Sequence, residues 1–239
     1  TEQTRLLIDA GLSGRQIRLR LAKIGRSPET LDGILLTHEH ADHSAGIRGL
    51  SKKANLPVFA NQDTANAVQA QLSRRPNWQI FETGHTFNFR GLRVQPFSVP
   101  HDAYDPVGFY FEWGGEDLFN PLESLAWVTD LGYAPELVKE KIAQASILVI
   151  EANHCPRMLE RDTKRPWSLK QRILGRHGHL SNGTTLELLK SIENPRWQEI
   201  FLVHLSKDCN DVNLVRDSFA ELSTDTYVVD PSTAEAIPA

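Results

Sequence analysis

Residues 37–43 read Thr-His-Glu-His-Ala-Asp-His and directly follow an apolar run. Three imidazoles and a carboxylate at this spacing are metal-binding side chains, since imidazole suits zinc, iron and manganese and carboxylate favours harder ions. On extended backbone His38 and His40 share a face, whereas Asp42 and His43 begin the next turn and approach from another side. The cluster therefore predicts that one segment serves two adjacent metals, rather than a turn of solvated histidines.

Single ligand-type residues also follow three other apolar runs of the chain. They are His101 after 94–99, Asp130 after 126–128 and His204 after 200–203. Taken alone, each is typical of a turn or a cap. Because the ends of neighbouring strands meet at one sheet edge, four such endings in one chain predict a single cluster of metal ligands.

The elements that must position these side chains alternate between short apolar runs and helical patterns. We expect strands at 6–9, 34–37, 58–60, 92–99, 107–113, 125–129, 147–151, 200–204 and 226–229, and helices at 14–24, 44–54, 64–73, 135–145, 167–176, 181–192 and 212–222. Pro135 in a first helical turn and Asp63 or Ser181 as N-caps support three helix starts. The alternation predicts an α/β protein with helices flanking sheets. Residues 114–123 are expected to form a long loop, and 230–239 a poorly ordered end.

The length of 239 residues, with 40% hydrophobic and 23% charged residues, predicts one globular domain with a sizeable core. No apolar stretch reaches the ~20 residues that span a bilayer, so no membrane partner is expected. Cys155 and Cys209 are the only cysteines, which fits a reducing cytoplasm and a metal site without thiolates. Nothing in the sequence indicates an oligomeric state.

The net charge of −4 argues against a broadly basic nucleic-acid-binding surface, but not against a nuclease, because bound cations add positive charge where phosphates would lie. Residues 157–176 nevertheless carry seven Lys and Arg against Glu160 and Asp162. This basic segment is either a solvated helical face or a track for a nucleic acid backbone. Trp167 within it could stack on a base, but we expect it to be buried and to anchor a helix.

The ordered polar residues resemble the metallo-β-lactamase superfamily. Its pattern is an early Asp, then His-x-His-x-Asp-His, a His, an Asp and a final His, here Asp9, 38–43, His101, Asp130 and His204. The resemblance covers essentially the whole chain and implies an αββα sandwich of two mixed sheets with a dinuclear site at one sheet edge. Family members begin with a strand before the first Asp, so we expect residues 1–239 to lack that first N-terminal strand.

The resemblance also implies a ligand for each metal position. One metal would be held by His38, His40 and His101, the other by Asp42, His43 and His204, with Asp130 bridging them and Asp9 supporting the site from behind.

Further strings are similar to the YycJ/WalJ (VicX) group of exonuclease-type proteins in that superfamily. They are Leu-Ile-Asp-Ala-Gly-Leu-Ser (7–13), Ser-Val-Pro-His-Asp-Ala (98–103), Asp-Pro-Val-Gly-Phe (105–109), Thr-Asp-Leu-Gly-Tyr (129–133), Glu-Ala-Asn-His (151–154), Gly-His-Leu-Ser-Asn (178–182) and His-Leu-Ser (204–206). In the related RNase-Z-type nucleases, a Glu at the end of the corresponding strand pairs with a His. The resemblance implies that Glu151 holds His179, which contacts the scissile phosphate and protonates the leaving oxygen. A pair that only ties down a loop is the alternative.

We therefore expect a dinuclear metal-dependent phosphodiesterase acting on nucleic acid and, by resemblance, a 5′-to-3′ exonuclease on single-stranded DNA. Two divalent ions, zinc or manganese with iron as an alternative, would share a hydroxide nucleophile that Asp42 orients or deprotonates. Ser181 and Asn182 begin a helix and either cap it or receive a phosphate. Hydrolysis of a small lactone, thioester or cyclic phosphodiester is the competing function, and a metal-bound scaffold without catalysis is a third. His85, His154 and His177 are given no role.

Overall fold

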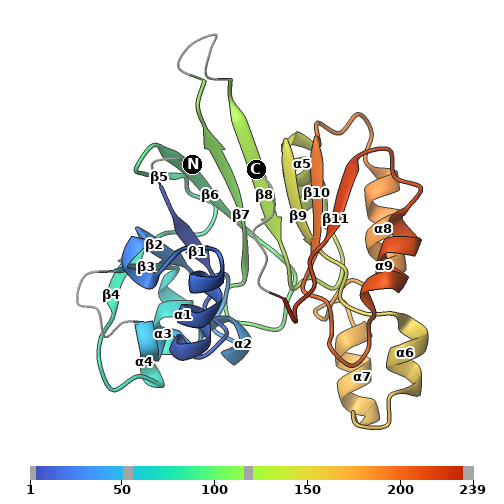
Figure 1. Ribbon diagram of the computed structural model, residues 1–239, viewed down its shortest axis with the longest axis horizontal. Coiled ribbons are helices and arrows are strands. Elements are labelled where there is room, and N and C mark those ends of the chain that lie inside the picture. The colour runs from blue at the N-terminus through green and yellow to red at the C-terminus, as the bar shows by residue number, and fades with distance from the viewer. Residues whose placement is uncertain (1–3, 51–55, 116–120, 234–239) are drawn as a thin grey trace. The chain divides into compact units, whose positions relative to one another are not determined.

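The computed structural model describes residues 4–50, 56–115 and 121–233 (Figure 1). The chain divides into two compact units. Unit 1 comprises residues 1–98, 103–107 and 233–239, and unit 2 comprises residues 99–102 and 108–232. Among the described helices, none combines the length and apolar character that crossing a bilayer requires.

Unit 1 is built around a four-stranded parallel sheet of order β1-β2-β3-β4. Its strands are β1 (Leu6–Ile8), β2 (Gly33–Leu35), β3 (Pro57–Ala60) and β4 (Asn77–Ile80). Its helices are α1 (Gly14–Lys23), the 3-10 helix η1 (Pro28–Thr30), α2 (Ala41–Ser44), α3 (Ile47–Leu50) and α4 (Gln62–Ala70). An antiparallel hairpin of β5 (Phe87–Phe89) and β6 (Leu92–Ser98) follows, and it turns at Arg90 and Gly91 with φ of 46° and 80°.

The core of unit 1 places two polar segments at one sheet edge. Ile34, Val58 and Ile47 are buried in it, and all three residues of β2 are buried. Because β1 and β2 are parallel, with Ile8 opposite Leu35, the residues after both strands leave at the same edge. The backbone continues this pairing, since the N–H of Asp9 donates to the carbonyl of Leu35 over 2.8 Å.

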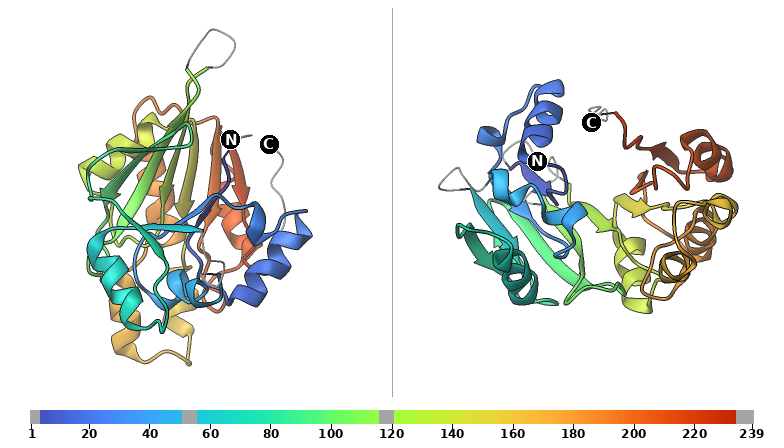
Figure 2. Two further views of the ribbon diagram at one scale, coloured as in Figure 1. Left: turned by 90° about the vertical axis from the view of Figure 1, so that its left-hand side faces the viewer. Right: turned by 90° about the horizontal axis from the view of Figure 1, so that it is seen from below.

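Unit 2 contains a sheet of order β11-β10-β9-β8-β7, parallel except for the antiparallel pair β7 and β8. Its strands are β7 (Val107–Trp113), β8 (Glu123–Val128), β9 (Ile147–Glu151), β10 (Glu199–Val203) and β11 (Asp225–Val228). Its helices are α5 (Glu136–Gln144), α6 (Pro156–Arg161), α7 (Trp167–Leu174), α8 (Asn182–Ser191) and α9 (Val212–Phe219). Helices α8 and α9 lie side by side with α9 against β11, whereas α5 contacts β8 (Figures 1 and 2).

The parallel strands of unit 2 end together. Val128 is opposite Ile150, and Glu151 is opposite Val203, so β8, β9 and β10 finish at one edge. The residues that follow these strands therefore emerge as neighbours, which is the clustering that the sequence predicts for this part of the chain.

Most predicted elements are confirmed. The strands predicted at 107–113 and 147–151 have the bounds of β7 and β9, and most others shift by at most three residues at an end. Ser181 caps α8 as predicted, whereas Pro135 lies at the N-cap position of α5 rather than inside its first turn. The predicted N-cap Asp63 is wrong, because the side chain of Asn61 accepts the hydrogen bond from Thr64 N–H and begins α4 one residue earlier than Asp63.

Four elements escape the sequence patterns, namely η1, β4, β5 and α6. Strand β4 is mostly exposed and β5 has three residues, so neither carries a clear hydrophobic period. The helix predicted at 44–54 is α2 followed by α3, and its last part, 51–55, lies outside the described residues. Residues 116–120 of the predicted loop and 234–239 of the predicted tail also lie outside them.

Candidate metal centre

In unit 1, Asp9 organises the polar segment after β2. Its Oδ1 accepts the N–H of Thr37 over 2.9 Å, and its Oδ2 accepts the Thr37 hydroxyl over 2.8 Å. Oδ2 also lies 2.7 Å from Nδ1 of His43. Because a carboxylate can only accept here, Nδ1 of His43 carries the proton, and Nε2 carries the lone pair that a metal ligand needs.

Thr37 fixes the neighbouring ring in the same way. Its single hydroxyl proton goes to Asp9, so the oxygen, 2.9 Å from Nδ1 of His38, accepts the proton of that nitrogen. Nε2 of His38 then carries the lone pair, and it lies 3.0 Å from Nδ1 of His40. The two imidazoles therefore converge through one nitrogen each, as two ligands of one ion do.

Asp42 is the exposed acid of the cluster. Its side chain is 73% exposed, and Oδ2 lies 3.7 Å from Nε2 of His43. The backbone around it is held very close to the loop after β1, because a Cβ on Gly11 would lie 1.4 Å from the Asp42 carbonyl oxygen. Glycine at position 11 is therefore required for the approach that sets the start of α2.

In unit 2, the fully buried carboxylate of Glu151 connects four partners. Oε1 accepts the N–H groups of Leu131 and Leu180 over 3.0 and 2.9 Å. Oε2 lies 3.2 Å from Nδ1 of His179 and 3.1 Å from Nδ1 of His204. Glu151 therefore orients both imidazoles and fixes the backbone at Leu131 and Leu180 next to them.

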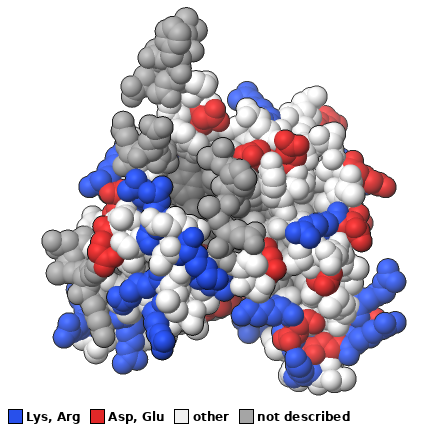
Figure 3. Space-filling view, viewed as in Figure 1, with Lys and Arg blue, Asp and Glu red and all other residues white. Residues whose placement is uncertain are grey.

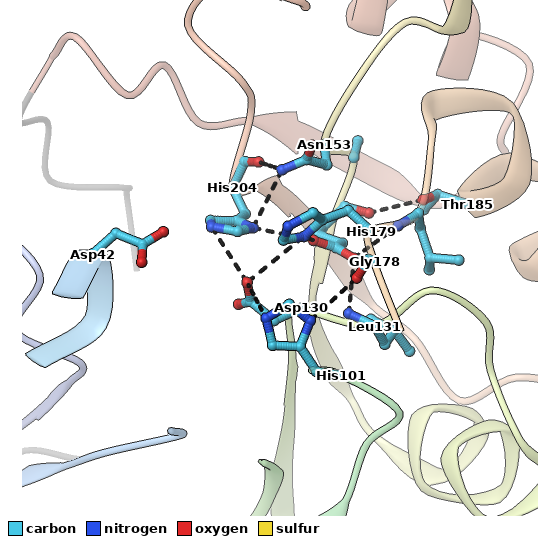
Figure 4. A network of polar contacts seen from close by, with 12 residues as sticks. Asp42, His101, Asp130, Leu131, Asn153, Gly178, His179, Thr185 and His204 are labelled. Atoms are coloured by element: carbon cyan, nitrogen blue, oxygen red, sulfur yellow. Dashed lines mark hydrogen bonds and ion pairs between the residues drawn. The ribbon is translucent and has the colours of Figure 1, made fainter. Parts of the chain in front are cut away.

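Asp130 lies among three imidazoles in the same unit. Its Oδ1 is 3.9 Å from Nε2 of His101, 3.7 Å from Nδ1 of His179 and 3.7 Å from Nε2 of His204 (Figure 4). These distances exceed those of direct hydrogen bonds. Single ligand atoms of Asp130, Glu151, His179 and His204 nevertheless lie within 4.8 Å of one another. Asp130 is therefore spaced from the three imidazoles as ligands around one ion are, whereas Glu151 is hydrogen-bonded to His179 and His204.

Acceptors fix the tautomers in unit 2 as well. Nδ1 of His101 donates to the carbonyl oxygen of Gly178 over 3.3 Å, and Nδ1 of His204 donates to Glu151. The amide of Asn153 donates to the carbonyl of His204 over 2.9 Å and fixes its backbone. In both rings Nε2 is left as the atom for a metal, the arrangement in which outer hydrogen bonds orient ligand histidines.

The pKa values in this cluster are shifted in opposite directions. Burial raises the pKa of Glu151, but hydrogen bonds from His179 and His204 outweigh it and lower the pKa to about 2. Burial lowers the pKa of His179, but the hydrogen bond and charge of Glu151, together with Asp130, raise it above its ordinary value. At neutral pH Glu151 is therefore a carboxylate, and His179 is held toward its protonated form.

Two further predicted residues make structural contacts. Ser181 Oγ accepts the N–H of Thr184 over 3.2 Å, which is an N-cap bond. Asn182 is buried and exchanges two hydrogen bonds of 2.9 Å with Asn210. A phosphate-binding role for Ser181 or Asn182 stays a prediction.

The three histidines without an assigned role differ in their surroundings. His85 is exposed beside Glu82, and His177 is exposed before the 178–182 turn. His154 is 1% exposed, and neither of its ring nitrogens has a hydrogen-bond partner among the described residues. Burial, which outweighs the charge of Glu151, lowers the pKa of His154 to about 4.

Ion pairs neutralise much of the basic segment 157–176. Lys164 and Arg165 pair with Asp208, Arg165 also with Asp162, and Arg172 with Asp102, while buried Lys170 donates to the carbonyl of Glu160. On the side of unit 2 that carries α6 and α7, acidic side chains lie among the basic ones (Figure 3). This segment is therefore not a continuous basic track.

The prediction that Trp167 is buried is wrong, because its side chain is 62% exposed in the first turn of α7. The inward face of α7 carries Lys170 and the half-buried Leu169 and Ile173. Trp167 shares an adjacent, exposed face with Leu174, two helical turns further on. The hydrophobic pattern of the helix does not show whether Leu169 and Ile173 or Trp167 and Leu174 face the core.

Sequence reasoning missed the partners that hold the predicted residues. Thr37, Asn153 and the backbone N–H groups of Leu131 and Leu180 lie within the quoted strings, but the sequence predicts no role for them. For Thr37 a signal existed, since it is a polar residue between a buried strand and a metal-ligand cluster. For the backbone donors no side-chain signal is possible.

The donor set fits divalent metal ions. It consists of imidazole nitrogens and carboxylate oxygens, which suit zinc, manganese and iron. In His38, His43, His101 and His204 a hydrogen bond at Nδ1 leaves Nε2 for the metal. Asp9, Asp130 and His204 have φ of 59°, 61° and 58°, a conformation that L-residues adopt rarely and that gathers at functional sites.

Residues 4–205 match the family model of the beta-lactamase superfamily domain, and the chain belongs to this superfamily. Its structure is similar to that of the metallo-beta-lactamase fold protein YhfI from Bacillus subtilis. The TM-score is 0.69 with 16% sequence identity, and the match covers 96% of this chain and 85% of that one. The prediction of an αββα fold, with two sheets flanked by helices, is confirmed.

Within the superfamily, two curated relatives match most of the sequence. The chain is 36% identical over 224 residues to exodeoxyribonuclease YycJ of Bacillus anthracis, which covers 93% of this chain and 82% of the relative. It is 38% identical over 214 residues to exodeoxyribonuclease WalJ of Streptococcus pneumoniae, which covers 88% of this chain and 77% of the relative. The predicted resemblance to the YycJ/WalJ group is confirmed.

Proposed function

We propose that this protein is a dinuclear metal-dependent phosphodiesterase that removes nucleotides from single-stranded DNA in the 5′-to-3′ direction. Two relatives that are named exodeoxyribonucleases support this function. The observation that carries it is the buried Glu151 carboxylate against His179, which raises the pKa of that imidazole. Cleavage of a phosphodiester expels a poor alkoxide leaving group, and a positioned imidazolium supplies the proton that it needs.

The proposed metals are two divalent ions, zinc or manganese, with iron as the alternative. One would be held by His38, His40 and His101, the other by Asp42, His43 and His204, with Asp130 shared. This assignment comes from membership of the superfamily, and the tautomers within each unit support it. The two free cysteines fit a reducing cytoplasm as the compartment.

The residues of the chain would divide the proton transfers between them. Bound metals would polarise the phosphodiester and activate the attacking water. The exposed carboxylate of Asp42 accepts a proton from that water as the new P–O bond forms. Nε2 of His179 gives its proton to the oxygen that leaves as the old P–O bond breaks, while Glu151 keeps Nδ1 bonded and stabilises the imidazolium.

A small-molecule hydrolase remains the second candidate. The net charge of −4 and the ion-paired basic segment favour a substrate that needs no long cationic track. A lactone, thioester or cyclic phosphodiester would need only the metals and one proton donor. The same assay separates the two functions.

The test uses protein loaded separately with manganese or zinc, and single-stranded DNA and RNA labelled at either end. We expect stepwise loss of 5′ nucleotides from DNA. His179→Ala should lower kcat by about 10²- to 10⁴-fold, because the proton donor is removed. Asp42→Ala should abolish turnover, which would also exclude a scaffold without catalysis.

His177→Ala is the matched control, since this exposed imidazole lies two residues from His179 and contacts no site residue that the structure describes. It should keep full activity. Intact oligonucleotides, from protein shown to hold two metals per chain, would contradict the nuclease and favour the small-molecule hydrolase. Equal losses in both variants would remove the role of His179.

A further inference from the structure

Tyr133 and Arg176 form an exposed stack of an aromatic ring and a guanidinium in unit 2. Tyr133 is 37% exposed, Arg176 is exposed, and Cζ of Arg176 lies 4.4 Å from the centroid of the ring. We propose that this pair is a stacking platform for the base of the nucleotide next to the cleaved bond. The proposal rests on the proposed function, and it names the part of the substrate that the chain holds besides the phosphate.

The platform is attached to both backbone segments of the candidate site. Tyr133 follows Asp130 by three residues, and Leu131 between them donates to Glu151. Arg176 precedes His179 by three residues, and the carbonyl of Gly178 between them accepts from His101. A base on the platform would therefore be anchored through the same two segments that carry the proposed metal-binding and proton-donating side chains.

Close backbone contact keeps these two segments together. A Cβ on Gly132 would lie 2.3 Å from the carbonyl oxygen of Gly175 and 2.4 Å from the carbonyl carbon of Arg176. The segments therefore meet where only glycine fits. Tyr133 and Arg176 flank this contact, so the stack is built on fixed backbone rather than on two mobile loops.

The surroundings of Arg176 differ from those of other cations in the basic segment. Arg165 and Arg172 are in ion pairs with carboxylates, and Lys170 is buried. Arg176 has no carboxylate partner among the described residues, and it lies over an aromatic ring instead. The guanidinium of Arg176 is therefore not paired with a carboxylate of the described residues of unit 2.

Planar guanidinium and phenol groups bind nucleobases by stacking, and an adjacent guanidinium strengthens this through its charge. Such stacking tolerates every base, because each has a π-face. It suits an enzyme that removes successive nucleotides regardless of sequence. It also distinguishes a nucleotide from a phosphodiester without a base.

The experiment measures binding and cleavage separately on metal-loaded protein. Binding is read by fluorescence anisotropy with phosphorothioate-linked single-stranded DNA, so that cleavage does not interfere. A series of oligonucleotides carries one abasic nucleotide at successive positions from the 5′ end. Wild-type protein, Tyr133→Ala, Tyr133→Phe, Arg176→Ala and the matched control Arg161→Ala are compared, since Arg161 is an exposed cation of the same basic segment.

We expect an abasic nucleotide at one or two terminal positions to weaken wild-type binding about tenfold, the effect of losing one stacked base. Tyr133→Ala and Arg176→Ala should bind about tenfold more weakly and lose this preference for a base. Tyr133→Phe and Arg161→Ala should keep the preference, because the ring or the platform is intact.

The platform is refuted if an abasic nucleotide weakens binding to Tyr133→Ala as much as binding to wild-type protein. It is also refuted if wild-type protein binds none of the oligonucleotides. Cleavage of unmodified DNA is scored on its own. Base-dependent binding without any cleavage would contradict the proposed nuclease activity but support the stacking platform. Cleavage without base-dependent binding would support the nuclease activity but contradict the platform.

Discussion

Asp9 and Glu151 have the same task in the two units. Each is a carboxylate that accepts the Nδ1 proton of a candidate ligand, His43 or His204. Asp9 also accepts one backbone N–H nearby, and Glu151 accepts two. Each therefore fixes the tautomer and the position of a ligand at once. Glu151 differs in binding a second imidazole, His179, whose pKa it raises. One buried acid thus holds both a candidate metal ligand and the proposed proton donor.

Glu151→Gln should change the pH dependence of the proposed nuclease. The Glu151 charge raises the pKa of His179, so the variant should lower that pKa. Activity that needs the imidazolium is lost as pH rises through this pKa, and the alkaline limb of kcat/KM should therefore move to lower pH. At pH 8 we expect roughly a tenfold loss or more. A uniform loss with an unmoved limb would make Glu151 a purely structural residue.

His154→Leu should change the pH dependence of stability. Burial lowers the pKa of His154 from 6.5 to about 4, so the unfolded chain takes up this proton first. Wild-type stability from this group is complete above pH 6.5 and is lost as pH falls toward 4, by about 3 kcal/mol in all.

Urea unfolding at pH 7, 5.5 and 4.5 measures this effect. The variant should lack this part of the acid loss, and at pH 7 it should be at least as stable, because the ring nitrogens that it removes have no hydrogen-bond partner among the described residues. His85→Ala, at an exposed histidine, is the control and should follow the wild-type curve. Parallel curves for all three proteins would contradict the prediction.

At the scale of elements, the candidate site residues are positioned by the ends of strands and by close backbone contacts at glycines. Strands β1, β8 and β10 are followed by Asp9, Asp130 and His204 in left-handed conformation, which turns each side chain away from the strand direction. The neighbouring loops pass at distances that only glycine allows, at Gly11 in unit 1 and Gly132 in unit 2. The geometry of the candidate site therefore depends on the backbone conformation as much as on side-chain contacts.

Gly11→Ala should lower the free energy of unfolding by about 2–4 kcal/mol, because the new Cβ would overlap the Asp42 carbonyl and displace α2. The metal content of the purified protein should fall as well. Gly183→Ala is the matched control, since the nearest atom is 3.9 Å away and the position lies in α8. That variant should be unchanged or more stable by up to about 1 kcal/mol. Equal metal content and stability in both variants would contradict the role of Gly11.

At the scale of the whole molecule, charge limits how the chain can hold a polyanion. The net charge is −4, and among the exposed cations of the basic segment only Arg157, Arg161 and Arg176 lack a carboxylate partner among the described residues. Affinity for nucleic acid must then come from a few phosphate contacts, base stacking and bound metals.

A salt titration of binding to single-stranded DNA tests this limit. Each phosphate contact contributes a slope of about −0.7 in log affinity against log salt concentration, so about three contacts predict a slope near −2. A slope steeper than about −5 would require a basic surface that the described residues do not provide. A slope of zero would favour the small-molecule hydrolase.

The sequence by itself determined the residue types, the α/β class and the ends of most strands. Ligand spacing in 38–43 and single ligand residues after three other strands were sufficient for the superfamily, because these features are local. That all of the chain is one domain stays a prediction. Trp167 and Asp63 show the limit, since the exposed face of a helix and its first residue depend on neighbouring elements.

Only the tertiary structure decided which groups hold the candidate ligands. The contacts of Asp9 with His43, and of Glu151 with His179 and His204, join residues far apart in the sequence. The stack of Arg176 on Tyr133 does so as well. Tautomers, pKa shifts and the stacking platform all follow from these contacts. These contacts form because, within each unit, parallel strands bring residues that are far apart in sequence to one sheet edge. Close packing there fixes the distances between them.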